Sequence, residues 1–278
     1  MFSTTSPCKL NLFLYITGKR LDGYHNLQTL FTILNYGDKM HFNLRDDGEI
    51  KLLTDFGFPQ SENLIYKAAL ALKNEAKKNL GCEISVNKVL AQGGGLGGGS
   101  SNAATTLLVL NKLWHLDLTE EKLLQIARSL GADVPIFVKG RPCFAQGIGD
   151  ILEPIKIKPR FYIVCNPKVQ VPTKLMFNSE LLKKDSPKLS YEELLKKPFE
   201  NCFTAPALAL FPQIGDLLAL LAQYGKSYMS GSGASCFISF DTEKEAIDVF
   251  EKLKAQGISC FLAQDCEISP VLLDLKRI

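Results

Sequence analysis

The chain has 278 residues, of which 46% are hydrophobic and 22% are charged, so it can form one large or two modest globular domains. Its formal net charge is only +3 and its basic residues are scattered, which argues against a nucleic-acid-binding protein. No apolar run is long enough for a membrane span, and the N-terminus lacks the basic-then-apolar pattern of a signal peptide. These features predict a cytoplasmic protein that binds neither nucleic acid nor membrane.

The eight cysteines are dispersed along the chain, and no two of them form a Cys-x-x-Cys pair. With only three histidines, the sequence lacks the usual patterns of a structural zinc site, and its metal ligands remain unknown. Cys165, Cys236 and Cys260 lie in apolar runs, so we expect reduced core cysteines rather than disulfides.

The first predicted strand covers Lys9 to Ile16, where four aliphatic residues alternate with other side chains. Lys9 and Asn11 therefore point to the same side of the strand, which either meets water or forms part of a site. The turn-rich loop that follows contains Tyr24 and His25, two rings that can contact a ligand or simply occupy an ordinary loop.

The next elements alternate strands with one helix, and each is bounded by turn residues. In chain order we expect a strand over Leu27–Leu34, a hairpin of Lys39–Leu44 and Glu49–Leu53 around Asp46-Asp47-Gly48, an amphipathic helix over Asn63–Leu80 ended by Gly81, and a strand over Glu83–Leu90.

The densest motif has six glycines between Gly93 and Gly99, followed by a helix predicted over Ser101–Trp114 and capped by Ser100 or Ser101. Each glycine costs about 0.5–1 kcal/mol relative to alanine inside regular structure, so a hinge between two packed elements has no reason to keep six. A loop around a ligand needs them, because glycine lets backbone amides approach closely. Amides at a helix N-terminus favour an anion, so the motif predicts a phosphate-binding loop.

Two other nucleotide motifs fit this stretch less well. A Walker loop requires a lysine that is absent here. The dinucleotide pattern Gly-x-Gly-x-x-Gly matches at Gly93, Gly95 and Gly98, but residues His115–Thr119 resemble a loop before a helix rather than the end of a second strand.

A third helix is predicted after Thr119, with Thr119 as its N-cap and Gly131 beyond its end. Asp133 then begins a short helix with Pro135 in its first turn. This carboxylate has two interpretations, a helix cap or a catalytic group near the phosphate loop.

The composition changes around Pro154–Pro159, which predicts two domains over residues 1–153 and 154–278. The second domain is expected to contain a strand over Phe161–Cys165, a helix from Pro212 to about Tyr224, a small-residue loop over Ser230–Ser235, and a β-α-β unit built from Cys236–Phe240, a helix capped by Thr242 with Glu245, and Ile258–Ala263.

Two Gly/Ser loops, a lysine and a carboxylate, without a cluster of metal ligands, favour phosphoryl transfer. This chemistry depends mainly on positioning and charge neutralisation. The carboxylate accepts the proton of the attacking hydroxyl, the lysine neutralises charge, and backbone amides hold the phosphates.

Three motifs in order resemble the GHMP small-molecule kinases: Pro7-x-Lys9-x-Asn11, Gly93–Asn102 and Gly231-Ser232-Gly233-Ala234. Asp22-Gly23-Tyr24-His25 and Leu130–Pro135 strengthen the resemblance, which spans nearly the whole chain and is loosest from 166 to 225. It implies an α+β fold, with an N-terminal domain like the second domain of ribosomal protein S5 and a ferredoxin-like C-terminal domain. The site is expected between them.

The resemblance also implies the reaction, which is ATP-dependent phosphorylation of the 2-hydroxyl of 4-diphosphocytidyl-2-C-methyl-D-erythritol in the non-mevalonate isoprenoid pathway. It implies Asp133 as general base, Lys9 as the catalytic cation and Asn11 as a substrate-orienting residue. The implied contacts for the cytidine diphosphate part are Tyr24, His25, Thr173 and Phe177.

ATP, accompanied by Mg²⁺, is expected to be held by the glycine loop and by two residues on the adenine side, Asn63 and Lys88. The loop residues implied are Ala91, Gln92, Gly93, Gly94, Gly95, Leu96, Gly97, Gly98, Gly99, Ser100 and Ser101. Ala91-Gln92 stands where the family pattern leads us to expect Pro-Met, which leaves the packing against adenine open.

Three alternatives compete with this hypothesis. Another GHMP kinase, of the homoserine or mevalonate type, is disfavoured by Gly23-Tyr24-His25. A non-catalytic nucleotide-binding regulator is disfavoured by the presence of Lys9 and Asp133. An RNA-binding module rests on fold analogy alone, and the modest charge speaks against it.

Overall fold

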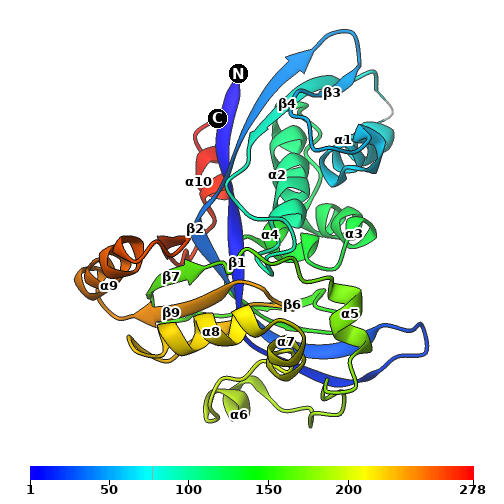
Figure 1. Cartoon of the computed structure of the whole chain (residues 1–278). Coiled ribbons are helices and arrows are strands. Elements are labelled where there is room, and N and C mark those ends of the chain that lie inside the picture. Colours follow the sequence, from blue (N-terminus) through cyan, green and yellow to red (C-terminus); the bar gives the residue numbers. More distant parts are fainter. Residues whose placement is uncertain (77) are drawn as a thin grey trace.

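The structure is a computed structural model that describes residues 1–76 and 78–278. It has two sheets with helices packed against them (Figure 1). Its elements, in chain order, are β1 (Phe2–Lys19), β2 (His25–Arg45), β3 (Ile50–Leu52), a short 3-10 helix (Gln60–Glu62), α1 (Leu64–Ala76), β4 (Gly81–Asn87), α2 (Gly98–Leu113), α3 (Glu120–Leu130), α4 (Val134–Lys139), β5 (Cys143–Gln146), β6 (Ile151–Pro154), β7 (Phe161–Cys165), α5 (Thr173–Asn178), α6 (Tyr191–Leu195), α7 (Thr204–Leu210), α8 (Pro212–Leu221), β8 (Tyr228–Met229), β9 (Cys236–Phe240), α9 (Glu243–Ala255), β10 (Cys260–Gln264) and α10 (Pro270–Leu275).

The first sheet has the strand order β3-β4-β2-β5-β6, with β1 paired antiparallel to β2. Helices α1 to α4 lie on one side of this sheet (Figure 1), and their apolar faces form the largest core cluster with it. The pair β1–β2 runs on toward the second sheet, where Leu14 and Ile16 of β1 enter another core. Because β1 joins both cores, residues in its middle lie at the junction of the two sheets.

The predicted hairpin around Asp46-Asp47-Gly48 is wrong. Asp47 does make the expected local turn, since its Oδ1 accepts a hydrogen bond from the Glu49 amide at 3.0 Å. However, β3 pairs in parallel with β4, because β4 already occupies the edge of β2 from Lys39 to Arg45. The two strands expected over 27–34 and 39–44 are also one continuous strand, β2, since both stretches pair with β1.

Two predicted helix boundaries are also wrong. The helix expected over 63–80 ends at Ala76, and Gly81 begins β4 instead of terminating a helix. Residue 77 of that prediction lies outside the described residues. Helix α2 begins at Gly98, with Gly97 as its N-cap in a left-handed conformation (φ 72°), so Ser100 and Ser101 are inside the helix and do not cap it. The two serines of the motif therefore present different faces of one helix.

The second sheet has the order β10-β7-β9-β8, and all of its neighbours are antiparallel. The unit β9-α9-β10 is a split β-α-β unit, because β7 lies between its two strands, as in a ferredoxin-like domain. β7 and β9 cover the residues that the sequence predicts, and Thr242 caps α9 by accepting a hydrogen bond from the Glu245 amide at 3.4 Å. The α+β fold expected from the sequence is therefore confirmed.

The last helix, α10, was not predicted from the sequence. It packs against β1 and α2, so the two chain ends lie near each other (Figure 1). The Thr4 hydroxyl donates a 2.8 Å hydrogen bond to the Asp274 carboxylate. The chain therefore returns to the first sheet after completing the second.

All eight cysteines are free, as the sequence predicts. Burial raises the pKa of the Cys82, Cys143 and Cys236 thiols to about 12, so these side chains are neutral core residues at pH 7. In the described part of the chain, no single helix has both the length and the hydropathy of a membrane span, whereas α7 and α8 meet that criterion only when the bent pair is taken together.

Candidate active site

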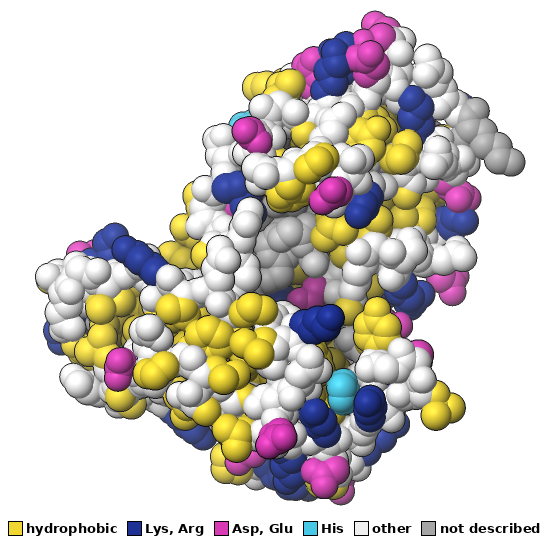
Figure 2. All heavy atoms as spheres, turned by 45° about the vertical axis from the view of Figure 1, so that its right-hand side comes forward, with side chains coloured by type: hydrophobic (Ala, Val, Ile, Leu, Met, Phe, Trp, Pro, Cys, Tyr) yellow, Lys and Arg dark blue, Asp and Glu magenta, His cyan; other side chains and the backbone are white. Residues whose placement is uncertain are grey.

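A cavity of about 650 Å³ lies where β1, the glycine loop and the second sheet's loops meet. Figure 2 shows the surface hollowed between the two halves of the molecule. The volume falls within the usual range of small-molecule sites, about 300–1,000 Å³. Its wall combines residues of β1, β2 and α5, the N-terminal turns of α2 and α4, and the late loop around Gly231.

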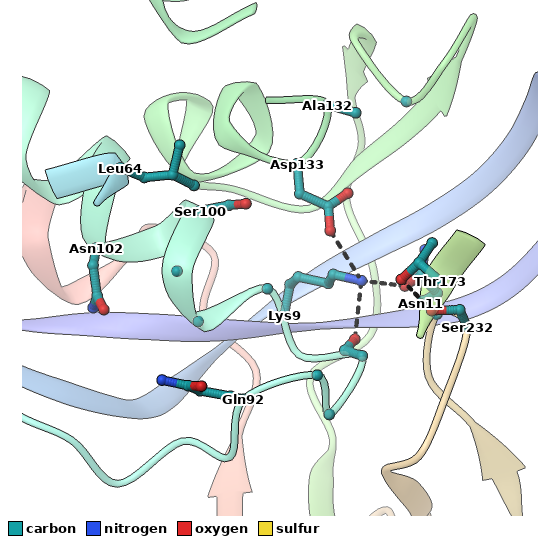
Figure 3. Close-up of a pocket in the computed structure, with 18 of the residues that line it drawn as sticks. Lys9, Asn11, Leu64, Gln92, Ser100, Asn102, Ala132, Asp133, Thr173 and Ser232 are labelled. Atoms are coloured by element: carbon teal, nitrogen blue, oxygen red, sulfur yellow. Dashed lines mark hydrogen bonds and ion pairs between the residues drawn. The ribbon is translucent and has the colours of Figure 1, made fainter. Parts of the chain in front are cut away.

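Lys9 lies at the centre of this cavity, and only 3% of its side chain is exposed. Its ammonium nitrogen is 2.5 Å from Asn11 Oδ1, 3.0 Å from the Gly95 carbonyl oxygen and 3.7 Å from Asp133 Oδ2 (Figure 3). An ammonium group has three N–H donors, and these oxygens supply three acceptors. The alternative in which this face of the first strand meets water is therefore wrong.

Asn11 is held in one orientation by Thr29. Its side-chain Nδ2 donates to Thr29 Oγ1 at 2.8 Å, and the Thr29 hydroxyl donates in turn to the Phe13 carbonyl at 2.5 Å. The amide oxygen of Asn11 consequently faces Lys9. Thr29 is a buried cavity residue that the sequence analysis missed, because strand alternation does not reveal which polar residue supports another.

Asp133 occupies the N-cap position of α4 but makes no side-chain capping hydrogen bond. Its carboxylate points toward Lys9 and into the cavity (Figure 3). Of the two interpretations left open by the sequence, the geometry therefore favours a carboxylate that is available to a ligand.

The glycine loop packs directly against the late loop. The Gly95 carbonyl accepts hydrogen bonds from both Lys9 Nζ and Ser230 Oγ at 3.0 Å, and the Ser235 amide donates to the Gly94 carbonyl at 3.1 Å. A Cβ atom on Gly95 would lie 2.2 Å from the Ser230 carbonyl oxygen, so only glycine permits this approach. Three motifs that are distant in sequence thus meet at one backbone carbonyl.

The first turn of α2 opens into the cavity and contains no acidic residue. A Cβ atom at Gly93 or Gly99 would meet nothing within 4 Å, so the backbone here borders free space. Free amides at a helix N-terminus stabilise a bound anion, and this turn therefore fits the phosphates of ATP.

Eleven of the thirteen residues expected to hold ATP line the cavity: Asn63, Lys88, Ala91, Gln92, Gly93, Gly94, Gly95, Gly97, Gly98, Gly99 and Ser100. The structure does not bring the other two there. Leu96 is 3% exposed and packs in a core cluster with β1 residues. Ser101 is fully buried, and its Oγ lies 2.8 Å from Ser6 Oγ, because the helical period turns it away from Ser100.

An aromatic pair, Phe56 and Phe58, also lines the cavity and was missed from the sequence. Their ring centroids are 6.1 Å apart, and Asn63 lies in the same wall, with its Oδ1 accepting a hydrogen bond from the Ile65 amide at 2.9 Å. The sequence does contain a signal for these cavity residues, which is two aromatic residues around Gly57 in a stretch without strand or helix periodicity. Their rings supply apolar surface beside a residue expected on the adenine side.

Thr173 and Phe177 of α5 also line the cavity. Thr173 Oγ1 lies 3.0 Å from Ser232 Oγ (Figure 3), and the Phe177 ring stacks on His25 at a centroid distance of 5.1 Å. His25 is behind Phe177 rather than in the cavity wall, and Tyr24, which is 60% exposed, is also outside that wall. Of the four residues expected around the cytidine diphosphate part, the structure thus brings two to the cavity.

Burial lowers the pKa of His25 below its usual value of 6.5, and the nearby charges of Lys184 and Lys19 lower it further. The ring is therefore neutral at pH 7 and able to both donate and accept a hydrogen bond.

Among the described residues, no group of three or more His, Cys, Asp or Glu side chains is arranged to hold a metal ion. Asp133 and Glu62 are the carboxylates in the cavity wall. Mg²⁺ in nucleotide sites commonly uses one or two carboxylates together with phosphate oxygens and water, so these donors are compatible with a magnesium–nucleotide complex.

Comparison with protein families finds two matching models. Residues 63–141 match the GHMP kinases N terminal domain, and residues 182–259 match the GHMP kinases C terminal domain.

Solved structures with the same fold include a 4-(cytidine 5'-diphospho)-2C-methyl-D-erythritol kinase, with a TM-score of 0.84 and 31% identity over 95% of this chain and 99% of that one. A homoserine kinase from Cytophaga hutchinsonii has a TM-score of 0.68 at 16% identity, covering 97% and 95% of the two chains. The Methanococcus jannaschii mevalonate kinase has a TM-score of 0.65 at 13% identity, covering 95% and 98%. The last two similarities show the fold alone.

Proposed function

This chain belongs to the GHMP kinase family, and we propose that it phosphorylates the 2-hydroxyl of 4-diphosphocytidyl-2-C-methyl-D-erythritol. As a member of that family it is an ATP-dependent small-molecule kinase. The proposal for the acceptor rests above all on the 31% identity to a kinase of that name, which extends over 95% of this chain. The Lys9–Asp133 pair beside the glycine loop supplies the chemistry that the reaction needs.

In the proposed reaction, the acceptor hydroxyl lies next to Asp133, which accepts its proton as the oxygen attacks the γ-phosphorus of ATP. A new O–P bond forms, and the bond between the γ-phosphorus and the β–γ bridging oxygen breaks. General base catalysis of this kind contributes about 10²–10⁴ in rate.

Lys9 has two roles in this scheme. Its ammonium holds the Asp133 carboxylate in place through an ion pair of 3.7 Å, and it neutralises negative charge that develops on the transferred phosphoryl group. The Gly95 carbonyl and Asn11 hold that ammonium in place, so little reorganisation is needed during the reaction.

The first-turn amides of α2 would bind the phosphates of ATP, while Phe56 and Phe58 would contact its base. The resemblance implies Lys88 on the adenine side, but its Nζ lies beside the first turn of α2, so we assign this side chain to the phosphates instead. Mg²⁺ bound with ATP would neutralise phosphate charge, with Asp133 and Glu62 as the carboxylates within reach of the cavity. Thr173 and Phe177 would contact the cytidine diphosphate part of the acceptor.

Such a reaction belongs to isoprenoid biosynthesis, and we place it in the cytoplasm, where the free cysteines would stay reduced.

The test is a coupled ADP-release assay with three acceptors, the cytidylated methylerythritol, homoserine and mevalonate, at saturating MgATP. We expect kcat/KM for the cytidylated acceptor to exceed the other two values by about 10⁴, since a site built for particular polar groups strongly rejects analogues that lack them. Phosphorus NMR of the product should show a new monophosphate on the methylerythritol carbon.

Comparable turnover of homoserine or mevalonate would instead assign the chain to one of those kinase types. ATP binding without ADP release for any acceptor would support the non-catalytic regulator.

A further inference from the structure

A second charged pair, Asp38 and Lys88, lies beside the ATP side of the cavity. Asp38, on β2, is fully buried, whereas Lys88 is 25% exposed and lines the cavity. The Asp38 carboxylate receives hydrogen bonds from Lys88 Nζ, from the Val89 amide at 2.9 Å, from the Leu90 amide at 3.0 Å and from Asn102 Nδ2 at 3.0 Å. The buried carboxylate thus has four hydrogen-bond donors, one of them cationic, and such charge-assisted hydrogen bonds fix its position.

In the sequence, these donors lie on both sides of the glycine loop. Lys88, Val89 and Leu90 precede the loop, and Asn102 follows it in α2. A loop with six glycines loses much conformational freedom when it is ordered, so its geometry depends on how its two ends are anchored. One carboxylate on a neighbouring strand provides an anchor for both ends.

The position of Lys88 is electrostatically unusual. Its Nζ lies 3.5 Å from the place where a Cβ of Gly98 would be, beside the first turn of α2. A cation at a helix N-terminus is disfavoured by the helix dipole, which favours anions there. Asp38 compensates for this repulsion when the site holds no ligand, while an anionic ligand in the cavity would meet both the lysine and the free amides.

The same network reaches β1, the strand that contains Lys9. Asn102 Nδ2 also donates to Ser6 Oγ at 2.9 Å, and Ser6 lies on β1 opposite Asp38, three residues before Lys9. The Lys9 amide in turn donates to the Leu96 carbonyl at 3.1 Å. Two contacts therefore hold the glycine loop to β1: Asn102, just after the loop, bonds Ser6, and Leu96, within the loop, bonds Lys9.

From this geometry we propose that Asp38 is a positioning residue of the ATP site, which acts through Lys88 and the two ends of the glycine loop without touching the nucleotide. This inference rests on the proposed ATP site but not on the identity of the acceptor.

The experiment measures ATP affinity by calorimetry and kinetic constants by ADP release for Asp38→Asn in the full chain. Asparagine retains one oxygen for the Val89 and Leu90 amides, but it removes the charge that balances Lys88. Because hydrogen bonds to charged groups are worth more than neutral ones, we expect the Kd and KM for ATP to rise about 10- to 100-fold. The kcat at saturating ATP and the KM for the acceptor should change by less than about threefold, because the proposed role of Asp38 is confined to ATP binding.

Two further variants separate positioning from general stability. Asp265→Asn removes a partly buried carboxylate just after β10, and it should leave the Kd for ATP unchanged. The double variant Asp38→Asn with Lys88→Met removes both charges, so it serves if the single variant folds poorly. If Asp38 acts through Lys88, the double variant should bind ATP no more weakly than Lys88→Met alone.

An unchanged Kd for ATP in Asp38→Asn would overturn the inference. Parallel losses in kcat, in the KM for the acceptor and in Tm would overturn it as well, because they would assign Asp38 to stability alone. A wild-type protein that binds ATP but does not phosphorylate the cytidylated acceptor would refute the proposed acceptor and leave this test intact.

Discussion

At the scale of single residues, Lys9 is a charged side chain that folding has almost removed from water. Burying an ammonium is costly unless each of its donors finds an acceptor. The oxygens of Asn11, Gly95 and Asp133 meet that requirement, but two of these residues are supplied by segments far from β1 in sequence. The buried ammonium therefore has all of its acceptors only when the complete site is assembled.

Asp133→Asn tests the base within this group. We expect kcat to fall by about 10²–10⁴, because the amide does not accept the proton. The Kd for ATP should stay within a few fold, and Tm should be nearly unchanged, since the Asp133 side chain makes no capping hydrogen bond in α4. ADP release, calorimetry and thermal unfolding measure the three quantities. Near-wild-type turnover would remove Asp133 from the reaction.

Phe177→Ala tests the proposed acceptor site. Stacking of an aromatic ring on a base is worth about 1–3 kcal/mol, so the KM for the cytidylated acceptor should rise about 5- to 150-fold. The KM for ATP should barely change, because Phe177 lies on α5 and stacks on His25, outside the glycine loop.

Tyr24→Ala is the matched variant. Its ring is 60% exposed and outside the cavity wall, so we expect a smaller rise in the KM for the acceptor. Equal rises for Tyr24→Ala and Phe177→Ala would show that the Tyr24 loop folds over the bound cytosine. A rise in both the acceptor and the ATP KM would indicate general unfolding instead.

At the scale of elements, the important contact is between two loops. The glycine loop connects β4 to α2, and the late loop connects β8 to β9, so their contact joins the first sheet to the second. Gly95 has φ 73° and no room for a Cβ, whereas Gly99 is helical and faces open space. The motif therefore contains glycines with different physical roles.

Gly95→Ala and Gly99→Ala separate those roles. Gly95→Ala should lower Tm and activity together, because its methyl group would collide with the Ser230 carbonyl. Gly99→Ala should keep Tm or raise stability by about 0.5–1 kcal/mol, since alanine is favoured in a helix. Its methyl group faces the cavity, so the KM for ATP should rise even though the fold is intact. Thermal unfolding and ADP release test the pair; equal behaviour of the two variants would contradict this division.

At the scale of the whole molecule, the two sheets are also joined beyond the active site. After β10, Asp265 forms a β-bridge with Leu34 of β2, and the Cys266 amide donates to the Ile33 carbonyl at 2.8 Å. Asp265 Oδ1 accepts a 2.8 Å hydrogen bond from the Arg160 amide, but its Oδ2 is buried and has no hydrogen-bond partner. Burial raises the pKa of this carboxyl above its usual value of 3.8.

This raised pKa predicts the sign of a pH effect on stability. A carboxyl group whose folded-state pKa is raised favours folding most when it is protonated, below its unfolded-state pKa. That contribution is lost as the pH rises through the folded-state pKa. Asp265→Asn should therefore be more stable than the wild type at pH 7, with the difference shrinking as the pH falls toward 4. Thermal unfolding of both proteins across this range tests the prediction, and a larger advantage at low pH would contradict it.

Local chemistry explains what was predictable from the sequence. Strands β7 and β9, the Thr242 cap and the shared direction of Lys9 and Asn11 depend on neighbours within a few residues, and all were predicted. The prediction of a ligand-binding loop at the glycine motif also rests on local sequence, because a dense run of glycines before a helix has few uses other than close approach to a ligand.

Only the tertiary structure decided which elements meet. The pairing of β3 with β4, the return of α10 to β1, and the convergence of Lys9, Gly95 and Asp133 all join segments that are distant in sequence. Asp38 illustrates the limit most clearly, since nothing in its local sequence distinguishes it from a surface carboxylate. Periodicity and turn residues determine the shape of each element, whereas partners depend on which surfaces pack together to bury apolar side chains and satisfy their polar groups.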